Sequence, residues 1–111
     1  MRTLRFIVRD QIIEKDPTCS FGGLVPGSSG YVKAEFIFSP EWKGFTKVAT
    51  FFSAMGNEYT PALLKDGKSC VIPSDALKKR VIKIQILGRK DDITMKTNKI
   101  EIFQSGEIGG N

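Results

Sequence analysis

The sequence from Tyr31 to Phe38, YVKAEFIF, places an apolar side chain at every second position. A strand projects successive side chains to opposite faces, so this alternation predicts a β-strand with one face against a core. The core face comprises Val32, Ala34, Phe36 and Phe38, and the other face Tyr31, Lys33, Glu35 and Ile37. The turn-forming residues 39–41, Ser-Pro-Glu, end the strand.

Similar runs occur on both sides of this stretch. They predict further strands at residues 3–9, 45–53, 58–64, 69–72, 81–87 and 93–103, and one helical turn at residues 75–79 that Ser74 caps. The sharpest turn signal is Asp66-Gly67, which suits the positive φ angles of a tight hairpin. We therefore predict an all-β fold: a single antiparallel β-sandwich of about seven strands with one short helical turn.

The domain organisation follows from length and composition. A chain of 111 residues with 41% hydrophobic residues suits one domain with a substantial core. We predict a β-sandwich domain at residues 1–104 and a flexible C-terminal tail at residues 105–111, which contain three glycines. No signal-peptide pattern and no run of about 20 apolar residues is present, so we expect a soluble protein made in the cytosol without a membrane contact.

The composition argues against catalysis. The sequence has no histidine, which excludes Ser–His and Cys–His pairs and histidine-ligated metals. Cys19 and Cys70 have no CxxC spacing; they suit two small buried hydrophobes, although a disulfide stays open. Asp91-Asp92 is a carboxylate pair, but neighbouring strand residues point to opposite faces, which favours a solvated turn. We predict no enzyme activity, no catalytic residue, no metal and no cofactor.

The net charge of +5 belongs to one segment. Residues 75–99 contain eight basic and three acidic residues, whereas the rest contains nine of each. A partner-binding surface is predicted at Lys78, Lys79, Arg80, Lys83, Arg89 and Lys90. Such a stripe suits an acidic protein or an anionic surface polymer. Nucleic acid is disfavoured because no aromatic residue is interleaved with these bases, and edge lysines that prevent wrong strand pairing are the simpler interpretation.

Trp42 is the only tryptophan. It fits either a core plug beside a turn or an exposed platform for a ligand. The nearby Gly44 indicates tight backbone geometry, which favours the plug.

Residues 33–51, KAEFIFSPEWKGFTKVATF, resemble a segment of small proteins from the structural gene clusters of phages and prophages of Gram-positive bacteria. The shared theme is an apolar-x-Phe strand followed by Trp-x-Gly, an apolar residue, Thr-Lys and a strand ending in Phe. The likeness extends from about residue 31 to 103 and includes the Val-x-Pro at residues 71–73. The resemblance implies an immunoglobulin-like sandwich in a phage tail or baseplate, and it supplies no catalytic residues.

Three functions therefore stand as hypotheses. The first is a non-enzymatic component of the virion, a tail or baseplate connector or accessory domain that contacts other phage structural proteins or forms a homo-oligomer. The second is a free phage-encoded inhibitor that binds a host defence or nucleic-acid-processing protein through the basic late strands. The third is binding of an anionic cell-wall polymer through the same lysines.

Overall fold

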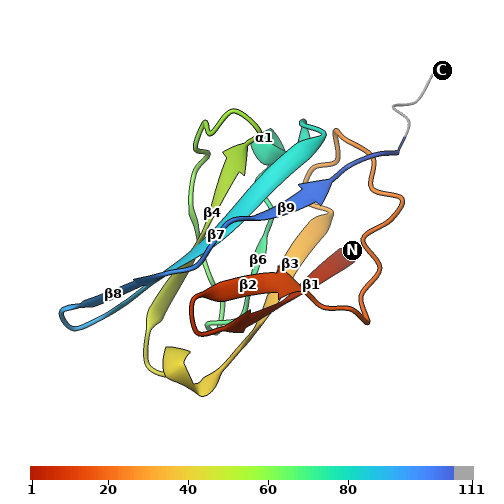
Figure 1. The fold of residues 1–111 in the computed structure, drawn as a ribbon. Coiled ribbons are helices and arrows are strands. Elements are labelled where there is room, and N and C mark those ends of the chain that lie inside the picture. Colours follow the sequence, from red (N-terminus) through yellow and green to blue (C-terminus); the bar gives the residue numbers. More distant parts are fainter. Residues whose placement is uncertain (107–111) are drawn as a thin grey trace.

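The computed structural model describes residues 1–106, which form two β-sheets with one core between them (Figure 1). The first sheet has the order β2-β1-β3-β6, and the second β5-β4-β7-β8, with β9 also pairing with β7. The strands are β1 (Arg2–Arg9), β2 (Ile12–Lys15), β3 (Val32–Phe38), β4 (Thr46–Ser53), β5 (Ala62–Leu63), β6 (Ser69–Val71), β7 (Val81–Lys90), β8 (Ile93–Lys96) and β9 (Ile100–Phe103). Two helical turns, η1 (Pro40–Trp42) and α1 (Ser74–Leu77), complete the fold. The all-β prediction is confirmed, and the two sheets are consistent with a sandwich.

The core forms from the predicted alternation. Every second residue of β1, β3 and β7 is buried, and these side chains face the opposite sheet. A row of aromatic rings runs through the core, with centroids 5.4–6.1 Å apart. Its members, in order, are Phe21, Phe6, Phe36, Phe38, Trp42 and Phe45. This row ends at the edge of the sandwich near η1, where the candidate site lies.

The prediction of an antiparallel sandwich is wrong for one strand pair. β1 and β3 run parallel, with Phe6 opposite Phe36 and Val8 opposite Phe38. The chain leaves β2 through the long connection at residues 16–31 and returns to the start of β1, where Arg2 N–H donates to Tyr31 C=O at 2.8 Å. β3 therefore starts beside the start of β1 and runs in the same direction.

The structure has nine strands rather than about seven. The predicted strand at residues 93–103 is divided into β8 and β9, because Asn98 turns toward the other sheet and its Oδ1 accepts a hydrogen bond from Ile13 N–H at 2.8 Å. β2, which no predicted strand covers, pairs antiparallel with β1. The predicted strand at 58–64 is reduced to β5 and an isolated bridge at Glu58.

Of two further local predictions, the hairpin turn is confirmed and the helix cap is wrong. Asp66 and Gly67 have φ angles of 51° and 67°, which confirms the hairpin turn. Ser74 was predicted as a helix cap, but it is the first residue of α1 and no side-chain hydrogen bond caps that turn. Of the predicted tail at residues 105–111, residues 107–111 lie outside the described part; Gly106 N–H donates to Leu24 C=O at 2.8 Å.

Candidate functional site

The first three predicted partner-binding residues are gathered at the start of β7. Lys78, Lys79 and Arg80 follow α1 and are exposed. The Lys78 ammonium lies 3.8 Å from an Asp75 carboxylate oxygen. Arg80 is joined to the end of the domain, since its C=O accepts a hydrogen bond from Gln104 N–H at 2.7 Å.

The other three lie farther along β7 and are not brought together with the first group. Lys83 is half-buried between its strand partners Phe52 and Glu101. Arg89 and Lys90 belong to the β7–β8 hairpin, which projects from the body of the domain (Figure 1). Arg80 and Arg89 are nine positions apart, or about 30 Å along an extended strand. The six residues therefore follow a strand and do not converge on one site.

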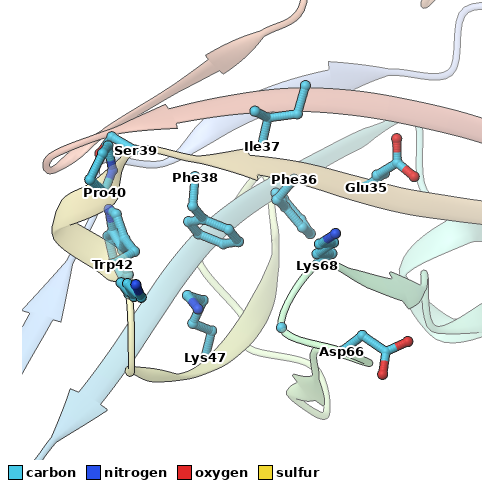
Figure 2. A pocket seen from close by; sticks show the side chains of 12 residues that line it. Glu35, Phe36, Ile37, Phe38, Ser39, Pro40, Trp42, Lys47, Asp66 and Lys68 are labelled. Carbon is cyan, nitrogen blue, oxygen red and sulfur yellow. The ribbon is translucent and has the colours of Figure 1, made fainter.

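A groove lies near η1 at the end of the aromatic row. It has a volume of about 540 Å³ and lies between the second half of β3, η1, the start of β4 and the 66–68 turn. Figure 2 shows Phe38, Lys47 and Lys68 around this space, with Ile37 on the opposite side of β3.

The floor of the groove is aromatic. Phe38 is only partly buried, and its ring lies 5.4 Å from that of Trp42. Trp42 is fully buried, and its Nε1–H donates to the Asp10 C=O at 2.7 Å, so the core-plug interpretation is confirmed. This hydrogen bond holds η1 against the β1–β2 turn and fixes the end of the groove.

The walls of the groove are positively charged. Lys43, Lys47 and Lys68 line it together with two acidic residues, Glu35 and Asp66. Glu35 already forms an ion pair, because its carboxylate accepts a hydrogen bond from Arg5 Nε at 3.0 Å. Within residues 1–106, no ion pair shorter than 4.0 Å involves any of the three lysines.

Lys47 occupies the centre of this arrangement. Its ammonium lies 5.0 Å from the centroid of the Phe38 ring, and a Cβ atom at Gly67 would be 3.4 Å from the same Nζ. Partial burial lowers the pKa of Lys47. The side chain is therefore desolvated over an aromatic ring without a carboxylate partner in the described structure.

A second concavity lies at the opposite side of the 64–68 turn, between β5 and β6. It has a volume of about 490 Å³ and is lined by Met1, Leu63 and Val71, among others. These three side chains, which we call the edge patch, are 70%, 68% and 45% exposed. Large apolar side chains that are exposed side by side are typical of protein–protein contacts.

The two cysteines are both free thiols. Cys70 is buried in β6, and desolvation raises the pKa of its thiol to about 12. Cys19 is partly exposed, and its Sγ accepts a hydrogen bond from Arg5 N–H at 3.3 Å. The interpretation as a small buried hydrophobe is thus confirmed for Cys70 and holds only in part for Cys19. Residues 1–106 contain no cluster of three or more potential metal ligands, and no helix among them has the length and hydropathy to span a bilayer.

Sequence reasoning missed both the groove and the edge patch. A signal for Lys47 exists, because strand alternation places it on the same face as Ala49 and Phe51, which are buried. A lysine near the end of a strand, on the face that packs into the core, indicates that its charged group lies where the core opens to solvent. The edge patch has no comparable signal, since its members come from three separate segments.

Comparison of the chain with protein-family models, with curated proteins and with solved structures finds no match.

Proposed function

We propose that this chain is a non-enzymatic component of a phage virion, an immunoglobulin-like connector or accessory domain of the tail or baseplate. It is made in the host cytoplasm and acts through contacts with other phage structural proteins or with copies of itself. It needs no cofactor for this role.

The edge patch is the observation that supports this proposal most strongly. Leu63 and Val71 stand on two short edge strands, and Met1 lies beside them. Monomeric soluble proteins tend to keep large apolar residues on sheet edges covered or replaced by charges. Burial of such a patch against a neighbouring subunit would contribute roughly 25 cal/mol per Å² of apolar area removed from water.

The resemblance to phage structural proteins supports the same role. Residues 33–51 form one structural unit of β3, η1 and β4. Gly44 has a φ of 83°, which suits the turn position in the shared Trp-x-Gly pattern. The six basic residues contribute nothing to the proposal, because they are spread from the segment before β7 to its far end.

The experiment is quantitative mass spectrometry of particles purified from the phage that encodes the chain. We expect the chain at a fixed copy number relative to other tail proteins. Leu63→Glu should lower its incorporation at least several-fold without changing the far-ultraviolet circular dichroism spectrum. Ile93→Glu is the matched control, since Ile93 is 57% exposed on β8 and lies outside the patch. Particles without the chain would refute the proposal.

A further inference from the structure

One edge of β3 is open in its second half. Pairing with β6 ends where Glu35 lies opposite Ser69, and the last hydrogen bond on that side joins Phe36 N–H to Lys68 C=O at 2.8 Å. The chain that precedes β6 turns away from β3 at this point, since Lys68 N–H donates instead to Lys65 C=O at 2.9 Å.

The backbone of Phe38 faces this open side. Ser39 N–H donates to Val8 C=O at 2.9 Å, so residue 39 faces β1. Because peptide groups alternate between the two edges of a strand, the N–H and C=O of Phe38 point the other way, into the groove. Within residues 1–106, no strand pairs with Phe38 on that side. An unpaired edge of this kind is a template for an added strand.

The surroundings of this edge select the added segment by charge. Three lysines line the groove, and Asp66 is the only acidic lining residue without an ion pair among the described residues. Lys47 Nζ stands 5.0 Å from the centroid of the Phe38 ring, and both residues line the groove. A carboxylate there would meet a partly desolvated ammonium, which strengthens the hydrogen bond between them.

We propose that the groove binds an extended acidic segment of a neighbouring protein, which adds to the edge of β3 at Phe38 and places a carboxylate on Lys47. The segment covers residues 37–39 of β3, about 10 Å of extended chain. Its apolar side chains rest on the partly exposed ring of Phe38, and its acidic ones meet the lysines. This inference rests on the proposed function, because it names the chemistry of one partner.

The probe is a blocked hexapeptide in which valine and glutamate alternate, added to the full ¹⁵N-labelled chain. We expect the amide resonances of Phe38 and Ser39 to shift on titration, and the Phe38 amide to become protected from hydrogen exchange. A matched peptide with lysine in place of glutamate should bind at least about tenfold more weakly, as expected for loss of a charge-assisted hydrogen bond.

Lys47→Met tests the charge while keeping an apolar stem over Phe38. We expect binding of the acidic peptide to weaken about tenfold. Lys96→Met is the matched control, since Lys96 is exposed on β8 and does not line the groove; it should leave binding unchanged. Equal binding by Lys47→Met and the original protein would overturn the role of Lys47.

The remaining outcomes separate this inference from the proposed function. If a saturating acidic peptide leaves Phe38 unchanged while the chain is found in purified particles, the inference fails and the proposed function stands. Peptide binding at Phe38 by a chain that is absent from particles would overturn the proposed function alone. Protection of Phe38 that grows with protein concentration, without peptide, would show a second copy in the groove and overturn the acidic partner.

Discussion

Gly88 of β7 lies directly against the indole ring of Trp42. A Cβ atom at position 88 would stand 2.6 Å from Trp42 Cζ3, and the backbone of Gly88 is not in a positive-φ conformation. The glycine is therefore required by the space that the ring occupies. The largest side chain of the core can close the end of the sandwich only because β7 has no side chain at this point.

Gly88→Ala should lower the free energy of unfolding by about 2 kcal/mol, because an added methyl overpacks a rigid aromatic site. Urea unfolding followed by the fluorescence of Trp42 measures this change. Gly22→Ala is the control, since a Cβ at Gly22 would have no atom within 4 Å and the residue has no positive φ. A Gly88→Ala variant that is as stable as the Gly22→Ala control would contradict the packing described.

Trp42→Phe should lower the free energy of unfolding by about 3 kcal/mol. The change leaves a cavity at a fully buried position and removes the Nε1–H donor to the Asp10 C=O. Circular dichroism in a urea series is the measurement, because the variant has no tryptophan. Tyr31→Phe, at a residue that is 54% exposed, should change stability by less than about 0.5 kcal/mol. Similar values for the two variants would argue against Trp42 as the core plug.

Cys70 should be unreactive toward thiol reagents in the folded protein. Its side chain is buried and burial raises its pKa to about 12, so the thiolate is scarce at neutral pH. A Cys19→Ala variant isolates the Cys70 signal in a colorimetric thiol assay. We expect no fast reaction in buffer and one full equivalent in urea. Rapid labelling of the folded variant would contradict the burial of Cys70.

The same pKa shift predicts a dependence of stability on alkaline pH. The unfolded thiol titrates near pH 8.5, whereas the folded one keeps its proton to about pH 12. Above pH 8.5 the unfolded state therefore binds fewer protons, and stability falls by about 1.4 kcal/mol per pH unit from this group. Cys70→Ala should remove that part of the slope between pH 9 and pH 11. Identical slopes would show that the thiol ionises equally in both states.

Asp16 should stabilise the fold only while it is ionised. Its carboxylate accepts hydrogen bonds from Thr18 N–H at 2.9 Å and from the Thr18 hydroxyl at 2.8 Å, and these bonds, with the nearby Arg5, lower its pKa. The contribution is present above the ordinary carboxyl pKa and is lost as pH falls through the lowered folded value. Asp16→Asn should therefore lower the melting temperature at pH 7 and approach the original protein below pH 3. The control, Asp92→Asn in the exposed β7–β8 turn, should show no such convergence.

Local alternation was sufficient to predict most strands and the buried faces of β1, β3 and β7. It did not show that β1 and β3 run parallel, because pairing depends on where the 16–31 connection returns. The predicted strand at residues 81–87 ended before Gly88, whereas β7 continues through it to Lys90. The place of Gly88 within β7 depends on Trp42, which is 46 residues away in the chain.

The candidate site was less accessible to sequence reasoning than the fold. The basic residues were predicted as a stripe, with Lys78, Lys79 and Arg80 before a strand and Arg89 and Lys90 at its far end, and the structure places the two groups at opposite ends of β7. The groove, in contrast, could not be predicted from any one stretch of sequence. Lys47, Phe38 and Lys68 come from different segments, and only the packing of the two sheets brings them together.

The open edge of β3 is tested most directly by amide hydrogen exchange at Phe36 and Phe38 in the free protein. Phe36 N–H is bonded to Lys68 C=O at 2.8 Å, so its exchange should be slow. Phe38 N–H faces the groove without a strand partner among the described residues, so its exchange should be fast. Slow exchange at Phe38 in dilute, monomeric protein would show that this edge is already occupied and would contradict the account.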